Sequence, residues 1–463
     1  MTRVVIIGGG PGGYESALVA AQLGAEVTVV DTDGLGGSAV LTDCVPSKTL
    51  IATAEVMAEL PRSSVLGITT QGHEGDAAEA VGIDLGRINA RVKQLATDQS
   101  SDIADRLTSE GVTVVRGRGR LDGPGRVVAV APDGTETSYD ADAVLVSTGA
   151  SPRTLPSAQP DGERILTWEQ VYDLKETPTK MIVVGSGVTG AEFASAYNAL
   201  GIDVTLVSSR DRVLPGEDAD AAEVLEEVFK RRGMEVLGKS RMKSVSRDGD
   251  TVTVALEDGR TVSGSHCLLA LGSVPNTAGM GLEEAGVALD AGGFITVDRV
   301  SRTTARGVYA AGDCTGVFML ASVAAMQGRI AMWHVLGDAV APLDLSIVAS
   351  NVFTSPEIAT VGVSQNAVDA GDVKADGVML PLATNARAKM QGIQDGFVKL
   401  FVSPHSRRVL GGVVVGPRAS ELIHPIALAV TMKVTADQLA QTFTVYPSLS
   451  GSIAEAARRL HQS

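Results

Sequence analysis

Residues 4–31 read VVIIGGGPGGYESALVAAQLGAEVTVVD, and this stretch decides the fold. A β-branched run at 4–7 meets a glycine cluster, a helical pattern follows up to Leu23, and a second strand pattern covers 26–31. Such glycines let the main chain reach a pyrophosphate at the helix N-terminus, and an acid ending the second strand accepts from ribose hydroxyls. The stretch predicts a dinucleotide site whose binding residues are Gly8, Gly10, Gly13 and Asp31.

The same pattern recurs in the middle of the chain. A strand pattern at 181–184 precedes GSGVTG at 185–190, then a helical pattern runs to Leu200 and another strand pattern covers 203–207. Each copy is followed by an Asp-Gly pair between strand-like runs, at 133–134 and at 258–259, which favours a hairpin. The repeat predicts an internal duplication and a second dinucleotide site with Gly185, Gly187 and Gly190.

Both halves end in an apolar run that closes in a glycine turn before a proline. These runs are AVLVSTGASP at 143–152 and CLLALGSVP at 267–275. A glycine turn at a strand end lets the main chain approach a ligand, although plain strand punctuation is an equal alternative for each run taken alone. The candidate ligand contacts here are Thr148, Gly149 and Gly272.

From residue 349 onward the pattern changes. Strand patterns at 398–402 and 409–415 are followed by helical patterns at 420–433 and 453–460, with no third glycine cluster, which indicates an α+β interface domain. We therefore expect an α/β protein with two Rossmann-like domains and a C-terminal interface domain. The expected bounds are 1–152 and 277–345 for the first domain, 153–276 for the second and 346–463 for the third.

Charge and cysteine content exclude several classes of protein. A formal charge of −15 disfavours nucleic acid and anionic membranes as partners. Cys44, Cys267 and Cys314 are far apart, so we expect neither a disulfide framework nor a metal site, and a reducing cytoplasm fits. No signal peptide and no membrane-spanning segment are expected. A polar, glycine-bearing insert at 65–84 is expected to be a loop or surface decoration.

Further motifs occur in a fixed order: GGS at 36–38, CVPSK at 44–48, YAAGD at 309–313 and FTSPE at 353–357. With the two glycine clusters, these motifs resemble the pyridine nucleotide-disulfide oxidoreductases, lipoamide dehydrogenase and glutathione reductase among them, over essentially the whole chain. The resemblance implies FAD on the first unit, a nicotinamide nucleotide on the second, and a homodimer in which each subunit completes the other's active site.

The resemblance also implies roles for single residues. Lys48 would lie near flavin N5 and pair with Glu192, where a cation stabilises the negative charge that arrives with a hydride. The plainer alternative is a lysine at a helix start and a solvated acid. The residues implied for FAD are Asp31 at the ribose, Gly37 and Ser38 in the loop before Lys48, Arg118 and Gly119 at the adenine, Asp313 at the ribitol and Ala321 at the flavin.

Three departures from the family pattern change the expected chemistry. Its disulfide reductases carry two cysteines in G-G-T-C-x-x-x-x-C-x-P-S-K, whereas Ala39 stands at the first position and Cys44 at the second. Their C-terminal H-P-T-x-S-E supplies an acid/base pair, whereas this chain has Tyr446 and Gly451 there. We expect no disulfide reduction. Reduced flavin would pass electrons to a quinone or dye, with Tyr446 as proton donor or as an aromatic space-filler.

The second unit lacks the acid that an NAD site carries at its strand end. Ser208 stands there and is followed by Ser209, Arg210, Asp211 and Arg212, a tract that suits the extra phosphate of NADPH. It resembles the tract of soluble pyridine nucleotide transhydrogenases. NADPH is the expected cofactor, with NADH still usable.

Four functions are consistent with these patterns. The first is an FAD-dependent NAD(P)H:quinone oxidoreductase, and the nearest alternative is a soluble transhydrogenase. A third is a reductase of peroxide or coenzyme A disulfide that uses Cys44 alone. The fourth is a paralogue that binds FAD without catalysis, against which the retained Lys48 and Glu192 argue.

Overall fold

The computed structural model describes residues 1–69 and 80–461. Its chain divides into two compact units. The first unit comprises Met1–Thr49, Asn89–Arg153 and Gly272–Asp344, and the second comprises Leu50–Ile88, Thr154–Leu271 and Leu345–Ser463. Residues 70–79 of the predicted insert lie outside the described residues, and the flanking 65–69 and 81–84 form no helix or strand.

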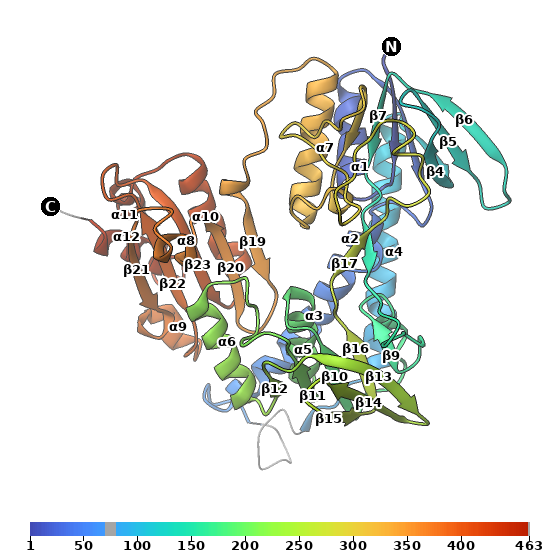
Figure 1. The fold of residues 1–463 in the computed structure, drawn as a ribbon. Helices are drawn as coiled ribbons and strands as arrows, with labels where there is room; N and C mark the ends of the chain where they lie inside the picture. The colour runs from blue at the N-terminus through green and yellow to red at the C-terminus, as the bar shows by residue number, and fades with distance from the viewer. Residues whose placement is uncertain (70–79, 462–463) are drawn as a thin grey trace. The chain divides into compact units, whose positions relative to one another are not determined.

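The first unit is built on a five-stranded parallel sheet in the order β18-β7-β1-β2-β3 (Figure 1). Its strands are β1 (Arg3–Ile7), β2 (Glu26–Asp31), β3 (Thr113–Arg116), β7 (Ala143–Val146) and β18 (Val308–Ala310). The helices α1 (Pro11–Gln22), α4 (Leu85–Ser109) and α7 (Ala321–Val335) supply the core on one face. The antiparallel strands β4 (Arg118–Leu121), β5 (Arg126–Val130) and β6 (Glu136–Asp140) pack on the other face.

Alternation along β1 explains these layers. Val4 and Ile6 point into the helical core, while Val5 and Ile7 point into the core beneath β5. A strand that is apolar on both faces must be covered on both sides, as the continuous run at residues 4–7 predicts. The short helix α2 (Gly37–Leu41) and the first turns of the longer helix α3 (Cys44–Ser63) follow β2 in this unit.

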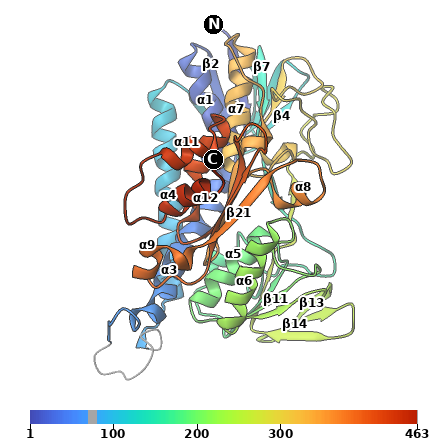
Figure 2. The same ribbon diagram turned by 90° about the vertical axis from the view of Figure 1, so that its left-hand side faces the viewer.

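The second unit repeats this plan in its first half. Its parallel sheet has the order β12-β11-β10-β16-β9. The strands are β9 (Ile165–Thr167), β10 (Lys180–Val184), β11 (Asp203–Val207), β12 (Glu235–Leu237) and β16 (His266–Leu269). Helices α5 (Val188–Ala199) and α6 (Ala219–Arg231) cover one face (Figure 2). The meander β13 (Met242–Asp248), β14 (Thr251–Leu256) and β15 (Thr261–Gly264) packs against the other.

The C-terminal part of the second unit is an antiparallel sheet in the order β19-β20-β23-β22-β21. Its strands are β19 (Ala349–Val352), β20 (Glu357–Gly362), β21 (Asp376–Pro381), β22 (Phe397–Val402) and β23 (Val409–Gly416). Its helices are α8 (Gln365–Asp369), α9 (Ala386–Met390), α10 (Ala419–Thr431), α11 (Ala436–Gln441) and α12 (Gly451–Arg459). Val398, Leu400 and Val402 of β22 face the core that α10 and α12 cover.

The architecture confirms the predicted fold class and both predicted Asp-Gly hairpins. The antiparallel pair β8 (Ala150–Pro152) and β17 (Ser273–Pro275) stands where the glycine turns were expected. The compact units change at Arg153, Gly272 and Asp344, but they also assign Leu50–Ile88 to the second unit. The four predicted domain bounds stay predictions. No helix among the described residues is long and apolar enough to span a bilayer.

Candidate functional site

The first glycine turn requires glycine by geometry. Gly8 has φ +101°, and a Cβ there would lie 2.2 Å from the carbonyl oxygen of Ser147. A Cβ on Gly13 would lie 1.9 Å from the carbonyl oxygen of Gly8. Gly10 is less crowded, because the nearest atom to a Cβ there would be the Cα of Gly37 at 3.9 Å. The N-terminus of α1 has no side-chain cap, and its first residue, Pro11, has no N–H. The N–H groups of Gly13 and Tyr14 donate to the carbonyl of Gly10 at 2.8 and 2.9 Å, so the N–H of Gly12 and the helix dipole remain for a phosphate.

Asp31 is held rigidly at the end of β2. Its Oδ2 accepts from the N–H of Gly9 at 2.7 Å, and its Oδ1 accepts from the N–H of Gly34 at 2.7 Å. Oδ1 also accepts from the N–H of Asp33 at 3.0 Å, so Oδ2 is the carboxylate oxygen that keeps a further lone pair for a ligand hydroxyl. The carboxylate is therefore placed beside the glycine turn, where a ribose is expected.

The loop before α3 lies against the same turn. The N–H of Gly36 donates to the carbonyl of Gly9 at 2.8 Å, and a Cβ on Gly37 would lie 2.8 Å from the Cα of Gly10. Ser38 is exposed, and its carbonyl accepts from the N–H of Asp43 at 2.7 Å. The loop that contains Ala39 is thus packed on the glycine turn through main-chain contacts, and its flavin-binding role stays a prediction.

The cysteines differ in their access to solvent. Cys44 begins α3 and is half-buried, and Lys48 lies one turn further along the same helix. Cys267 and Cys314 are fully buried, and burial raises the pKa of both thiols, to about 11 for Cys314. None of the three cysteines forms a disulfide in the described chain, and Cys44 is the one whose side chain is not buried.

Asp313 supplies the observation that tests the fit of FAD. Burial, and then the nearby carboxylate of Asp43, raise the pKa of Asp313 to about 6. Within the described residues its carboxyl group has no hydrogen-bond partner. A largely buried carboxyl without a protein partner fits a ligand hydroxyl such as that of the ribitol. Ala321 begins α7 a few residues later. The residues present therefore fit FAD.

A pocket of about 590 Å³ in the first unit matches the expected adenine end. Gly119 of β4 is not in its lining; it is buried against β1, since a Cβ there would lie 2.6 Å from Cγ2 of Ile7. Arg118 donates to the carbonyl of Ala278 at 3.2 Å. The lining residues are Thr32, Arg116, Gly117, Arg118, Arg120, Val130, Ala131, Pro132 and Gly279.

The two other glycine turns lie at the antiparallel pair β8 and β17. Thr148 Oγ1 donates to the carbonyl of Asn276 at 2.8 Å, and the Asn276 amide donates back to the carbonyl of Thr148 at 3.0 Å. Gly149 has φ +68° and Gly272 φ +85°, and a Cβ on either would meet no described atom within 4 Å. Both turns thus leave open space beside the main chain.

The second glycine turn reproduces the first. Gly185 has φ +115°, and a Cβ there would lie 2.1 Å from the carbonyl oxygen of Ala270. A Cβ on Gly190 would lie 1.9 Å from the carbonyl oxygen of Gly185, and one on Gly187 would meet no described atom within 4 Å. The internal duplication therefore extends to the geometry of the phosphate cradle.

The serine and arginine tract after β11 has one buried serine, Ser208, followed by exposed residues. Ser208 is 0% exposed, and its hydroxyl lies 2.6 Å from that of Ser186. Ser208 thus ties the loop to the glycine turn from the inside. Ser209 and Arg210 are exposed. The guanidinium of Arg212 donates to the carbonyl of Pro215 at 3.3 Å, which leaves Arg210 as the open cation of the tract.

Glu192 lies on α5 and is only 4% exposed. Its Oε1 accepts from the N–H of Phe353 at 2.8 Å. One turn along α5, Ser195 Oγ accepts from the N–H of Ser355 at 3.0 Å, and Arg232 donates to the Ser355 carbonyl at 3.1 Å. Lys48 belongs to the first unit and Glu192 to the second, so the ion pair between them stays a prediction.

Tyr446 stands on an exposed segment after α11. Its exposed fraction is 86%, and the neighbouring Phe443 and Val445 are exposed as well. Leu428 on α10 and Met432, which follows the last residue of that helix, are also exposed large apolar residues. Apolar side chains of this number on one domain are typical of a contact with another subunit.

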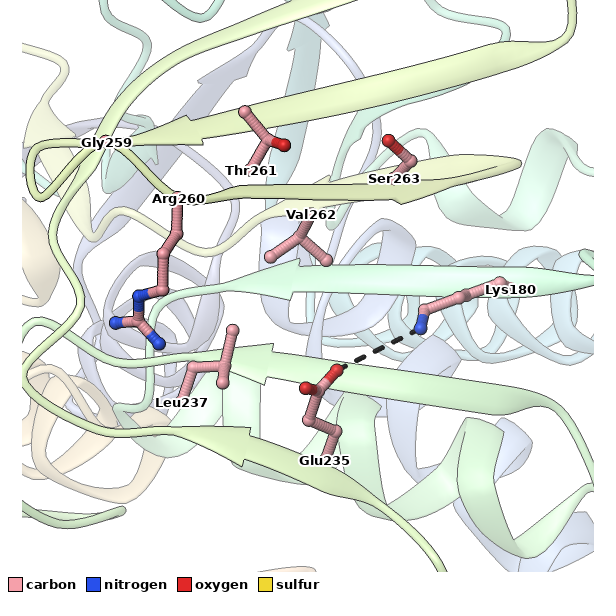
Figure 3. Close-up of a pocket in the computed structure, with 8 residues that line it drawn as sticks. All are labelled: Lys180, Glu235, Leu237, Gly259, Arg260, Thr261, Val262 and Ser263. Atoms are coloured by element: carbon pink, nitrogen blue, oxygen red, sulfur yellow. Dashed lines mark ion pairs between the residues drawn. The ribbon is translucent and has the colours of Figure 1, made fainter.

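A second pocket, of about 460 Å³, lies between β10, β12 and β15 (Figure 3). Lys180 lies 4.0 Å from Glu235 and 3.5 Å from Asp203, so its cation is already paired. Lys180 and Glu235 are the first residues of their strands, whereas the glycine turn follows the last residue of β10. Nucleotides bind at the carboxyl ends of parallel strands, so this pocket is not the nucleotide site.

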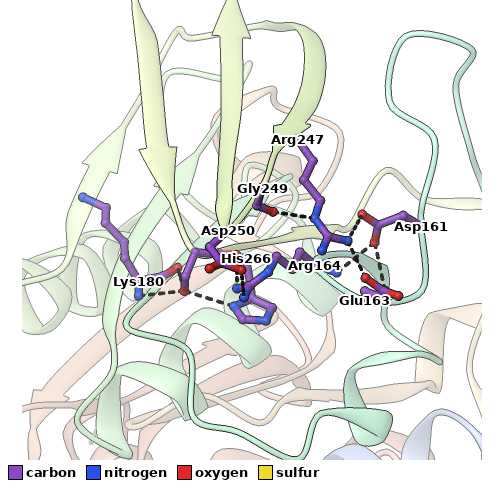
Figure 4. Close-up of polar contacts among 9 residues, drawn as sticks. Asp161, Glu163, Arg164, Lys180, Arg247, Gly249, Asp250 and His266 are labelled. Atoms are coloured by element: carbon purple, nitrogen blue, oxygen red, sulfur yellow. Dashed lines mark hydrogen bonds and ion pairs between the residues drawn. The ribbon is translucent and has the colours of Figure 1, made fainter.

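A polar network surrounds the amino ends of β9 and β16 (Figure 4). Arg247 contacts Asp161 at 3.1 Å and Glu163 at 2.6 Å. Burial, followed by the charge of Arg164, lowers the pKa of His266 to about 4, so its imidazole is neutral near pH 7. This network ties strands together at the edge opposite the glycine turn.

Two phosphate cradles of one design, with a buried carboxyl suited to a ribitol, define an oxidoreductase that uses a flavin and a nicotinamide nucleotide. The chain belongs to the pyridine nucleotide-disulphide oxidoreductase family, whose model matches residues 2–328. The model of the family's dimerisation domain matches residues 348–457. The family implies FAD and NAD(P)H as cofactors, and its dimerisation domain suggests a homodimer.

Individual relatives agree with this assignment. An NAD(P)H dehydrogenase (quinone) of Mycobacterium tuberculosis is 59% identical over 99% of this chain and 94% of its own. A dihydrolipoyl dehydrogenase of Zymomonas mobilis is 33% identical over 98% of this chain and 96% of its own. The crystal structure of LpdA from Mycobacterium tuberculosis superposes with a TM-score of 0.94 at 58% identity and covers 100% of both chains.

Proposed function

We propose that this protein is an FAD-dependent NAD(P)H dehydrogenase that passes electrons from reduced flavin to a quinone or dye, without disulfide reductase activity. One observation carries the proposal: the loop that packs on the glycine turn keeps its main-chain contacts but holds Ala39 five residues before Cys44. A family member that had lost its cofactor site would not retain this cradle. The printed name of the 59% identical relative supports a quinone as acceptor.

When bound, FAD would supply the redox chemistry: acceptance of a hydride from the nicotinamide and release of electrons singly or in pairs. The chain holds and orients it. The proposed roles are phosphate binding by the main chain at Gly8, Gly10 and Gly13, hydroxyl binding by Asp31 and Asp313, and charge stabilisation beside the flavin by Lys48 with Glu192.

Proton supply is proposed to come from the segment around Tyr446. This side chain is exposed in one subunit and lies on the domain that matches the family's dimerisation domain. In a homodimer the partner subunit's Tyr446 would deliver a proton to the acceptor. The homodimer itself is testable by light scattering. A reducing cytoplasm is the compartment that cysteines without a disulfide in the described chain favour.

NADPH is the proposed reductant, with NADH as a weaker alternative. Ser208 replaces the acid that would repel a 2′-phosphate, and Arg210 offers an open guanidinium near it. The same tract favours the second candidate function, a soluble pyridine nucleotide transhydrogenase, in which a second nicotinamide nucleotide replaces the quinone.

An acceptor panel separates these functions. The FAD-loaded protein is assayed with NADPH and with NADH against a soluble quinone, thio-NAD, lipoamide and glutathione disulfide. The proposal predicts fast quinone turnover and no disulfide turnover. Faster reduction of thio-NAD than of quinone would favour the transhydrogenase. A flavin that NADPH does not bleach without oxygen would indicate a non-catalytic paralogue.

A further inference from the structure

The chain after β12 runs alongside the tract after β11. The N–H of Ser208 donates to the carbonyl of Leu237 at 2.9 Å, and the N–H of Ser240 donates to the carbonyl of Ser208 at 2.7 Å. Between them, the N–H of Lys239 donates to the carbonyl of Arg210 at 2.7 Å. Lys239 and Arg210 are thus joined through their main chains, although they lie far apart in sequence.

Lys239 has an uncommon main-chain conformation. Its φ is +52°, in the left-handed region that a long side chain rarely adopts. The preceding Gly238 packs tightly, since a Cβ there would lie 3.2 Å from the carbonyl oxygen of Asp211. Such conformations persist where the surroundings enforce them, often at ligand sites.

Two uncompensated cations result. Lys239 and Arg210 are both exposed, and within residues 1–69 and 80–461 neither side chain has a hydrogen bond or ion pair. Their neighbour Arg260, by contrast, pairs with Asp258 at 2.6 Å and donates to Ser240 Oγ at 2.6 Å. Asp211 is nearby in sequence but forms no ion pair with either cation in the described chain. Adjacent like charges favour a bound anion.

The place in the fold identifies the anion. Arg210 and Lys239 follow the carboxyl ends of β11 and β12, at the edge where the glycine turn follows β10. The bond between Ser186 and Ser208 joins that turn to the tract. A nucleotide with its pyrophosphate on the turn extends its adenosine ribose toward the neighbouring strand ends. A dianionic group on that ribose would meet both cations.

We propose that Lys239, together with Arg210 and Ser209, binds the 2′-phosphate of NADPH and so sets the preference for NADPH over NADH. The inference rests on the proposed use of NADPH and extends it to a residue outside any recognised motif. Because Ser208 is buried with its hydroxyl engaged, Ser209 and the two cations supply the polar contacts.

The experiment titrates 2′,5′-ADP and 5′-AMP calorimetrically into the FAD-loaded protein and its Lys239→Met variant. For 2′,5′-ADP we expect Kd to rise about tenfold in the variant, since one charge-assisted contact to a phosphate is lost. For 5′-AMP we expect no change. KM should rise for NADPH and stay constant for NADH. Lys243→Met, an exposed lysine on β13, is the matched control and should match the wild type.

Two outcomes would overturn the inference. If Lys239→Met binds 2′,5′-ADP as tightly as the wild type, Lys239 does not touch the phosphate. If the wild type binds both nucleotides equally, the preference for NADPH fails together with the inference. Neither measurement involves an electron acceptor, so a wrong assignment of quinone as acceptor would leave both readouts unchanged and would be detected separately.

Discussion

The N–H of Phe353 donates to Oε1 of Glu192 at 2.8 Å, which joins helix α5 to the first residue after β19. A buried carboxylate needs donors of this kind, because it has lost its water. Glu192 thereby connects the nicotinamide-binding half of the second unit with the C-terminal sheet. Its proposed partner, Lys48, would add the charge that serves the flavin.

Glu192→Gln tests the catalytic role of this carboxylate. The amide oxygen can still accept from Phe353, so we expect a stability change of about 1 kcal/mol or less. We expect flavin reduction by NADPH to slow at least about tenfold, because the proposed charge partner of Lys48 is gone. Stopped-flow absorbance measures this rate. Glu223→Gln, an exposed acid on α6, is the control, and an equal rate in both variants would remove Glu192 from the mechanism.

The position of the segment at 353–356 is predicted to depend on the hydrogen bonds that Ser195 and Arg232 make with Ser355. Ser195→Ala and Arg232→Gln each remove a contact to Ser355, so we expect losses of about 1 kcal/mol in the free energy of unfolding. Flavin reduction should also slow in both, since Phe353 would hold Glu192 less firmly. Arg231→Gln, which removes the neighbouring ion pair to Asp395, should leave the rate unchanged. Equal rates in all three variants would restrict these contacts to stability.

Lys399 is predicted to be a critical structural cation. It is 3% exposed, and its Nζ lies 2.8 Å from Asp218 and 2.6 Å from Asp220 at the start of α6. Lys399→Met would leave buried Asp218 without its partner, at a cost of about 3–5 kcal/mol in urea denaturation.

Two further variants control for this effect. Adding Asp218→Asn should recover part of the loss, because asparagine still caps the helix without a charge. Lys230→Met removes an exposed cation whose partner, Glu226, still accepts from the N–H of Val213, and should cost about 0.5 kcal/mol or less. Equal losses for Lys230→Met and Lys399→Met would contradict the prediction.

The residues that sequence could assign share one property: their role follows from local spacing. Gly8 and Gly185 were predictable because a strand, a tight turn and a helix in sequence force a positive φ. Ser208 was predicted at the correct strand end, but its side chain turns inward because a second hydroxyl, that of Ser186, lies 2.6 Å away. That contact depends on the packing of two loops.

Other contacts depend on register or on the main chain. Lys239 meets Arg210 only because β12 pairs with β11 in one register, and no motif marks it. Phe353 acts through its N–H, which any residue would carry. The structural role of Lys399 could have been predicted from the sequence, because a single lysine in the apolar run FVKLFV needs a buried partner. The family, the fold class and the oxidoreductase class were predicted correctly, whereas the site residues remain predictions.

The substitution Asp313→Asn is predicted to have opposite effects on the stability of the apoprotein and on the binding of FAD. Burial and Asp43 raise its pKa from 3.8 to about 6, so the folded apoprotein holds this proton more tightly than the unfolded chain does. Stability contributed by this group is therefore present below pH 3.8 and is lost as the pH rises through about 6. We expect apo Asp313→Asn to be more stable than the wild type near pH 7, with the difference vanishing in acid.

The same variant should bind FAD more weakly, because a ligand hydroxyl loses its carboxylate acceptor. Thermal unfolding of the apoprotein at several pH values and titration with FAD measure the two effects. A variant that loses stability at every pH would mean that Asp313 has a protein partner.

The central claim is that electrons leave the flavin for a quinone without passing through a thiol. The direct test reduces the flavin with one equivalent of NADPH and then mixes the reduced protein with a soluble quinone, in the wild type and in Cys44→Ser. The account predicts that both proteins reoxidise at the same rate, within about twofold, and that lipoamide reoxidises neither. A large loss of rate in Cys44→Ser, or rapid reoxidation of the wild type by lipoamide, would contradict it.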